Sequence, residues 1–222
     1  MSDELLSETA GAIAGAIGPE RDEILREMDE RAEREKFPTV GPDVGGWLSL
    51  LARAVEAERI FEFGSGFGYS AYWFARALDT DGNVVLTETD ARNLNDAREY
   101  FERGGLADRA TFEHGDAIEV VDRYEGPFDV VLLDNEKDRY VEAFDAVRGK
   151  LREGSLVLAD NAVTAGSIDA DDVQGLLAGD SRPAATAASS GIAEYLSQVR
   201  AAEAFETSLL PLGEGVAVSV RL

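Results

Sequence analysis

Two stretches of this sequence run from apolar residues into side chains whose oxygen atoms can bind a cation. Residues 128–133 form one such run and lead to Asp134, while residues 154–159 form another and lead to Asp160 and Asn161. Carboxylate and amide oxygens are the ligands that hard cations such as Mg²⁺ prefer. If both runs are parallel strands of one sheet, their carboxyl ends share an edge and bring these side chains together. The alternative is that the three residues cap the helices that follow.

Scarce residue types limit the other chemistry that the chain can perform. There is no cysteine, which excludes thiolate catalysis, disulfides and cysteine–zinc sites. The one histidine, His114, ends a predicted strand, where a lone histidine is more often structural than catalytic. A serine–histidine triad and a multi-histidine metal site are therefore strongly disfavoured, and any metal must be held by oxygen atoms.

A glycine-rich turn follows the first predicted strand, which covers residues 60–63. Glycines stand at positions 64, 66 and 68, and Glu62 precedes them, so we expect a carboxylate to face the same pocket. The spacing matches neither the dinucleotide motif nor the phosphate-binding loop. Alternate glycines after an acidic strand end are typical of methyltransferases that use S-adenosylmethionine (SAM). The alternative is an ordinary turn from a strand into a helix.

A second acidic strand end supports a nucleoside ligand. Glu88 closes the strand predicted at residues 84–88 and lies 20 positions after Gly68. An acid at this spacing typically accepts hydrogen bonds from ribose hydroxyls. The third strand, residues 110–114, leads into a polar turn with Asp116 and Ala117, which is placed to contact an adenine.

Seven predicted strands, alternating with helices along most of the chain, indicate an α/β protein with a doubly wound sheet. The last two, at residues 205–210 and 216–222, form a hairpin that adds an antiparallel strand to an otherwise parallel sheet. We expect a helix at 192–202 and a variable loop with a short helix at 165–190. The sequence shows no linker, so residues 1–222 are predicted to form one domain.

The segment before the glycine turn is predicted to be helical. Residues 1–36 form either a helical lid or dimer arm, or a solvated packing layer. Asp43 is a plausible N-cap for a further helix that reaches Val55. Its core-facing residues are expected to be Trp47, Leu48, Leu50 and Leu51.

The composition is strongly acidic. The 222 residues carry a net charge of −23, and only three of the 21 basic residues are lysines: Lys36, Lys137 and Lys150. Dispersed acidity with scarce lysine suggests a halophilic protein, because molar salt screens the repulsion between the like charges of such a surface. The alternative is a generic acidic cytosolic enzyme. The negative charge of this surface also disfavours nucleic-acid partners, because their phosphates are negatively charged as well. No apolar run is long enough to cross a membrane, and the acidic N-terminus does not resemble a signal peptide, so we expect a cytoplasmic protein.

Three motifs in order resemble the metal-dependent O-methyltransferases, the group of the catechol and caffeoyl-CoA enzymes with its prokaryotic relatives. They are Phe61-Glu-Phe-Gly-Ser-Gly-Phe-Gly-Tyr-Ser70, Leu133-Asp-Asn-Glu-Lys-Asp-Arg-Tyr140 and Leu158-Ala-Asp-Asn161. The likeness extends from about Val40 to the C-terminus. It implies a Rossmann-like, class I SAM methyltransferase fold, SAM as cofactor, a divalent metal such as Mg²⁺, and a homodimer.

The resemblance also implies roles for individual residues. The metal ligands are Asp134, Asp160 and Asn161, and Lys137 is the general base beside Asp134. The residues around SAM are Val40, Glu62, Gly64, Ser65, Gly66, Ser70, Glu88, Asp116, Ala117 and Asp134. The catechol enzyme has histidine and tryptophan where this chain has Asn135 and Glu136, which leaves the acceptor open.

The implied reaction transfers a methyl group from SAM to a metal-chelated hydroxyl of a small catechol-like or phenolic acceptor. One alternative is methylation of a hydroxylated wobble uridine in tRNA. Another is a noncatalytic SAM-binding module, which would bind the cofactor without metal dependence. A nicotinamide dehydrogenase is disfavoured by the glycine spacing.

Overall fold

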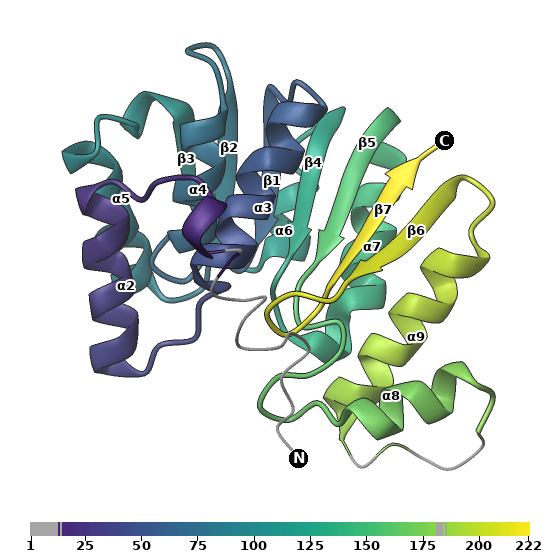
Figure 1. Cartoon of the computed structure of the whole chain (residues 1–222). Helices are drawn as coiled ribbons and strands as arrows, with labels where there is room; N and C mark the ends of the chain where they lie inside the picture. Colours follow the sequence, from purple (N-terminus) through teal and green to yellow (C-terminus); the bar gives the residue numbers. More distant parts are fainter. Residues whose placement is uncertain (1–12, 14, 181–183, 185) are drawn as a thin grey trace.

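A computed structural model describes residue 13, residues 15–180, residue 184 and residues 186–222 of the chain, and Figure 1 shows the arrangement. The strands are β1 (Arg59–Phe63), β2 (Asn83–Glu88), β3 (Ala110–His114), β4 (Phe128–Leu133), β5 (Leu151–Ala159), β6 (Phe205–Leu210) and β7 (Val216–Arg221). The helices are α2 (Glu23–Glu35), α3 (Gly41–Ala54), α4 (Tyr69–Ala77), α5 (Ala91–Arg103), α6 (Ala117–Val121), α7 (Tyr140–Val147), α8 (Ala170–Leu177) and α9 (Ala187–Ala201). Three short 3₁₀ helices are η1 (Ala107–Arg109), η2 (Lys137–Arg139) and η3 (Arg148–Lys150).

The seven strands form one sheet in the order β3-β2-β1-β4-β5-β7-β6. The first five pair in parallel, and β7 is antiparallel to both of its neighbours, β5 and β6. The strand order reverses direction between β1 and β4, which is where open α/β sheets bind ligands. The predicted α/β sheet with its antiparallel C-terminal strand is confirmed.

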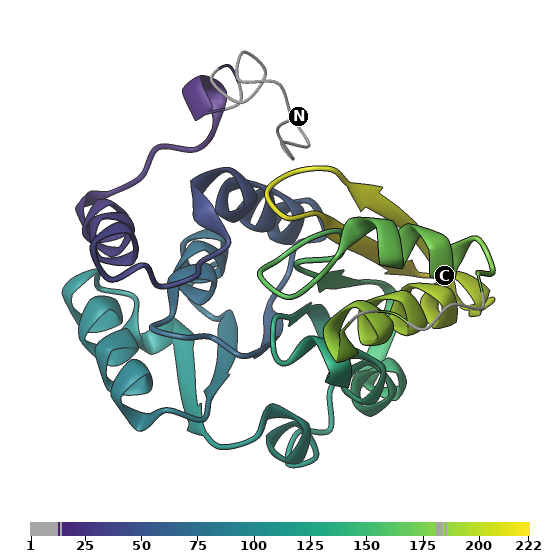
Figure 2. The same cartoon turned by 90° about the horizontal axis from the view of Figure 1, so that it is seen from below.

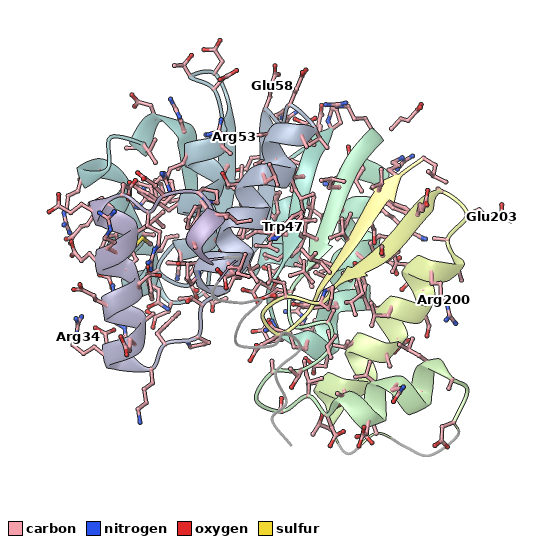
Figure 3. The ribbon with its side chains drawn as sticks, viewed as in Figure 1. Arg34, Trp47, Arg53, Glu58, Arg200 and Glu203 are labelled. Carbon is pink, nitrogen blue, oxygen red and sulfur yellow. The ribbon has the colours of Figure 1, made fainter. Side chains whose placement is uncertain are left out.

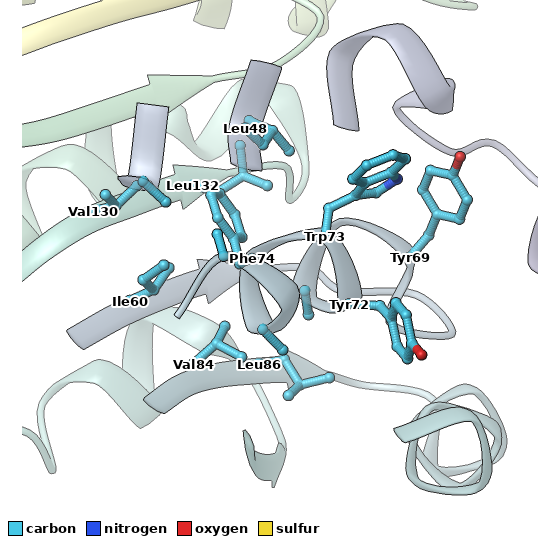
Figure 4. Packing of buried hydrophobic residues seen from close by; sticks show 14 of the residues in the cluster. Leu48, Ile60, Tyr69, Tyr72, Trp73, Phe74, Val84, Leu86, Val130 and Leu132 are labelled. Atoms are coloured by element: carbon cyan, nitrogen blue, oxygen red, sulfur yellow. The ribbon is translucent and has the colours of Figure 1, made fainter. Parts of the chain in front are cut away.

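Helices cover both faces of this sheet, as Figures 1 and 2 show. Because side chains alternate along a strand, each central strand feeds two cores. On β4, Val130 and Leu132 pack with α3, α4 and α5, whereas Val131 and Leu133 pack with α6, α7 and α9. Figure 4 shows the first core, in which Trp73 and Phe74 of α4 lie over the sheet. None of the described helices combines the length and apolar character that crossing a bilayer requires.

Helix α2 packs against the body of the domain through charged and aromatic side chains. Tyr69 of α4 donates a hydrogen bond to Asp29, and Arg31 pairs with Asp96 of α5 at 2.6 Å. Leu25 and Met28 are fully buried beneath these contacts. Helix α2 therefore packs on α4 and α5, the role of residues 1–36 as a lid or dimer arm stays a prediction, and residues 1–12 and 14 lie outside the described residues.

Two predicted helix starts are wrong. Helix α3 begins at Gly41, with Val40 as a cap that uses no side chain, so Asp43 lies inside the first turn. Pro42 explains the early start, because proline favours the first helical positions. Helix α9 begins at Ala187 instead of residue 192, because the hydroxyl of Thr186 caps the amide of Ser189 at 3.0 Å.

The predicted core face of α3 is only partly right. Its buried positions are spaced by four residues at Val44, Leu48 and Ala52, as expected for one helix face. Trp47 and Leu50 leave that face and are 40% and 53% exposed. Figure 3 labels Trp47 on this helix.

We predict that Asp129 stabilises the sheet at the end opposite to the strands' carboxyl ends. Its buried carboxylate accepts hydrogen bonds from the amides of Glu58 and Arg59, both at 2.8 Å, and from Arg152. Asp129→Ala leaves these donors without an acceptor and should lower the free energy of unfolding by about 1–3 kcal/mol in urea titrations. Asp122→Ala is the control, since the Asp122 side chain is 79% exposed. Equal stability of the two variants would contradict the prediction.

Candidate active site

A cavity of about 610 Å³ lies at the carboxyl ends of strands β1 to β5. Of the residues proposed from the sequence, all except Glu62 line it. The residue pairs of the sheet explain this convergence, because Phe63 stands opposite Leu133, and Leu133 stands opposite Ala159. The residues that directly follow Phe63, Leu133 and Ala159 therefore lie side by side at the same edge of the sheet.

The glycine turn after β1 forms one wall of the cavity. Gly64 has a φ of 80°, and a Cβ there would lie 2.7 Å from the carbonyl oxygen of Asp134. The amide of Ser65 donates to the carbonyl of Thr87 at 2.9 Å, which ties the turn to the end of β2. Gly66 and Ser70 also line the cavity. The missing side chain at Gly64 therefore lets the turn pack directly against the backbone that follows β4.

The carboxylate of Glu62 does not face the cavity as predicted. On β1, Glu62 points with Ile60 toward α4, where it is fully buried and accepts a hydrogen bond from the hydroxyl of Ser70. Its other oxygen, Oε2, has no partner among the described residues. Burial raises the pKa of Glu62 to about 8, the Ser70 hydrogen bond opposes this, and the charge of Asp134 adds to it. Glu62 therefore lies behind Ser70, which itself lines the cavity.

Glu88 and Asp116 lie at the neighbouring strand ends. Glu88 Oε1 accepts the amide of Asp90 at 2.7 Å, which fixes the carboxylate at the rim. Asp116 caps α6 through the amide of Ile118 and pairs with Arg139 at 2.7 Å. Burial alone would raise the pKa of Asp116, but Arg139 and the amide outweigh it and hold the pKa below its usual value. Ala117, which follows, also lines the cavity.

The segment between α2 and α3 covers another side of the cavity. Phe37, Pro38, Thr39 and Val40 all line it. The ring of Phe37 packs on Phe67 at 4.8 Å between centroids, and it occupies the space next to Gly66 that a Cβ would need. Val40 thus belongs to a segment that contacts the glycine turn through Phe37.

Asp134, Asp160 and Asn161 meet at the ends of β4 and β5. The amide of Asp160 donates to Leu133 at 3.1 Å, and the buried hydroxyl of Tyr140 reaches the carbonyls of Leu133 and Asp160 at 2.9 and 3.1 Å. Burial and the charge of Asp134 raise the pKa of Asp160 to about 7, and burial also raises the pKa of Asp134. Two carboxylates are therefore held together at an energetic cost, which positive charge nearby reduces.

Lys137 supplies a positive charge to this cluster. Its ammonium lies 2.7 Å from Asp134 Oδ1, and its side chain is 17% exposed. It also lies 5.1 Å above the ring of Tyr140. The amine is thus fixed beside the two carboxylates and open to the cavity.

Sequence reasoning missed one carboxylate of the site, Glu214. It stands in the turn between β6 and β7, accepts a hydrogen bond from the side-chain amide of Asn161, and lines the cavity. Its backbone carbonyl accepts the amides of Val163 and Thr164, both at 3.1 Å. The sequence signal was a glutamate between two glycines in the predicted turn. The position of Glu214 beside Asn161 depends on the pairing of β7 with β5, which brings the turn to this end of the sheet.

The donor set fits a hard divalent cation. Among the described residues no three His, Cys, Asp or Glu side chains form a metal-binding group, whereas Asp134, Asp160 and Asn161 offer two carboxylates and one amide in the same cavity. Asp160 Oδ1 is buried without a hydrogen-bond partner among the described residues, and a bound cation would satisfy this acceptor. Two carboxylates and one amide leave further coordination positions for a ligand and water.

The O-methyltransferase family model matches residues 16–222. A catechol O-methyltransferase of Niastella koreensis is 31% identical over 76% of this chain and 78% of its own length. A caffeoyl-CoA O-methyltransferase of Petunia hybrida is 27% identical over 69% of this chain and 66% of its own length. The crystal structure of the O-methyltransferase TomG from Streptomyces achromogenes, in complex with SAM, superposes with a TM-score of 0.83 at 23% identity, covering 100% and 99% of the two chains.

The buried Glu62 predicts a specific dependence of stability on pH. Its pKa is about 8 in the folded chain, against an ordinary value of 4.5. Its protonated form is therefore favoured by folding, and its contribution is full below about pH 4.5 and is lost as pH rises to about 8. The stability of Glu62→Gln relative to the unmodified protein should accordingly increase between pH 5 and 8 in urea titrations.

The matched control for this measurement is Glu203→Gln. Glu203 is exposed and is labelled on the surface in Figure 3, so its difference from the unmodified protein should stay constant with pH. A constant difference for Glu62→Gln as well would refute the assignment of a raised pKa to Glu62.

Proposed function

Because this chain belongs to the O-methyltransferase family, we propose that it transfers a methyl group from SAM to a hydroxyl of a small catechol-like or phenolic acceptor. The observation that carries this proposal is the cluster of Lys137, Asp134, Asp160 and Asn161 in one cavity beside the glycine turn. The catechol enzyme of Niastella koreensis supports the acceptor class. Catechols carry two adjacent hydroxyls, which suit a cation with several open positions.

The proposed place of SAM is the part of the cavity between the glycine turn and the ends of β2 and β3. Gly64 and Gly66 line this part of the cavity, beside the proposed place of the methionine portion. Glu88 keeps one carboxylate oxygen for the ribose hydroxyls, and the turn at Asp116 and Ala117 borders the adenine. The TomG structure, which has the same fold and was solved in complex with SAM, supports SAM as the cofactor.

The proposed metal ligands are Asp134, Asp160 and Asn161. When bound there, a cation such as Mg²⁺ lowers the pKa of an acceptor hydroxyl and fixes its oxygen. The unpartnered Oδ1 of Asp160 and the raised pKa values of both aspartates support a cationic occupant. The carboxylate of Glu214 accepts a hydrogen bond from the side-chain amide of Asn161 and so orients that side chain. The amide oxygen of Asn161 is left to act as a ligand.

Lys137 acts as the base in this proposal. In its neutral form, the amine would take the hydroxyl proton, the acceptor oxygen would attack the methyl carbon of SAM, and the carbon–sulfur bond would break. The electron pair of that bond stays on sulfur, so the sulfonium becomes a neutral thioether. Asp134 orients the amine, since it accepts its hydrogen bond at 2.7 Å. The segment at Phe37 to Val40 shields one side of the cavity from water.

The homodimer expected from the sequence and the adaptation to molar salt stay predictions. The acidic composition is the support for the latter, and assays are therefore designed in molar KCl. Undermethylated tRNA serves as the second acceptor in each assay. Methylation of tRNA without methylation of a catechol would overturn the proposed acceptor class.

We predict that turnover requires a divalent cation and its ligands. With labelled SAM, Mg²⁺ and a catechol panel, a chelator should abolish methyl transfer. Asp160→Ala and Asn161→Ala should each lower kcat by about 100-fold or more, because the cation contributes several kcal/mol to the transition state. Calorimetric titration with Mg²⁺ should show weaker binding in both variants. Asn95→Ala, on the exposed face of α5, is the control, and unchanged turnover in Asn161→Ala would sink the metal assignment.

We also predict that Lys137→Met separates proton removal from cofactor binding. Loss of a general base should lower kcat by about 10²- to 10⁴-fold. The dissociation constant for SAM should change little, because the amine contacts Asp134 and not the glycine turn. Lys36→Met, at an exposed position, is the matched control. If Lys137→Met keeps full turnover, another group removes the proton.

A further inference from the structure

Helix α9 touches the backbone of the loop that carries Lys137. The contact is made at Gly191, where a Cβ would lie 2.5 Å from the Cα of Asp138 and 2.5 Å from the carbonyl oxygen of Lys137. Both atoms belong to the backbone of η2, so neither can turn away as the end of a flexible side chain could. The helix and the loop are therefore so close that no side chain fits between them at this position.

Helical conformation itself does not require glycine at this position. Gly191 stands inside α9, its φ lies outside the left-handed region, and the helix continues to Ala201. A glycine within a helix is about 1 kcal/mol less favourable than alanine. The close approach to η2 is the feature of the structure that accounts for the missing side chain.

The same helix supports the site through a second contact. Tyr195 lies one turn after Gly191 and packs edge-to-face on Tyr140, with 5.8 Å between the ring centroids. Tyr140 in turn reaches the carbonyls of Leu133 and Asp160. One face of α9 thus backs both the Lys137 loop and the ends of β4 and β5.

We propose that Gly191 is a positioning residue that sets the place of Lys137 in the cavity. The absent side chain lets α9 press on residues 137 and 138, and this holds the ammonium at 2.7 Å from Asp134. A methyl group at position 191 displaces η2 and, with it, the amine. The inference rests on the proposed function, in which Lys137 is the base.

The test compares Gly191→Ala with Gly149→Ala. Gly149 lies in η3, and a Cβ there meets no atom within 4 Å, so the control makes the same chemical change without a clash. We expect kcat of Gly191→Ala to fall by about 10- to 100-fold, since small displacements of a reacting group have such effects. Binding of SAM, measured by calorimetry, should be unchanged. Hydrogen exchange should become faster in peptides that cover residues 134–140.

A double-mutant cycle with Lys137→Met separates positioning from general damage. If Gly191 acts through Lys137, Gly191→Ala should change the residual rate of Lys137→Met by less than about twofold. A full additional loss in the double variant would overturn the inference, and so would a normal kcat in Gly191→Ala when Lys137→Met is impaired. Full turnover in Lys137→Met would instead refute the role of Lys137 in the proposed function.

A folding defect would not leave the inference untested. Should Gly191→Ala fail to fold, the same measurements apply to Gly191→Ala combined with Asp138→Gly, in which the loop backbone can move away from the new methyl group. Asp138→Gly alone is its control. The combined variant should fold and still show the lower kcat, and a kcat equal to that of Asp138→Gly would contradict the proposal.

Discussion

The parallel pairing of β1, β4 and β5 brings like charges together at one edge of the sheet. Asp134 and Asp160 follow directly after residues that stand opposite each other, and the turn of Glu214 adds a third carboxylate nearby. Asp160 is buried and Asp134 is half-buried, and the pKa of each is raised. Such an arrangement is unfavourable for folding alone, and the large apolar cores on both sides of the sheet offset it. Proteins keep such an unfavourable grouping of like charges mainly at functional sites.

Much of this site could be predicted because the direction of each parallel strand determines which of its ends borders the ligand site. Apolar runs such as residues 128–133 indicated buried parallel strands, and ligands bind beyond the carboxyl ends of such strands. That rule alone is enough to bring Asp134, Asp160 and Asn161 to the same edge of the sheet. The strand ends at Glu88 and Asp116 follow by the same reasoning, and each of these side chains lines the cavity.

The sequence-based predictions were wrong where tertiary contacts or the direction of a side chain determine the position of a residue. Glu62 was expected in the cavity, although alternation along β1 directs it with Ile60 into the helix-covered face. Glu214 was missed because its place depends on how the hairpin pairs with β5, and pairing across so many residues leaves no local pattern. The exposed Trp47 and Leu50 show that an apolar residue in a helix need not belong to its buried face.

The segment that covers the cavity is short and is attached at both ends. Helix α2 before it is fastened to α4 and α5 by Asp29 and Arg31, and α3 after it packs into the core through Leu48. Lys36 and Gly41, with φ values of 53° and 74°, turn the chain sharply at its two ends. A segment with so few free torsions has little conformational entropy to lose when a ligand orders it. Enclosing a ligand under residues 37–40 is thus entropically inexpensive, and more of the contact energy remains as affinity.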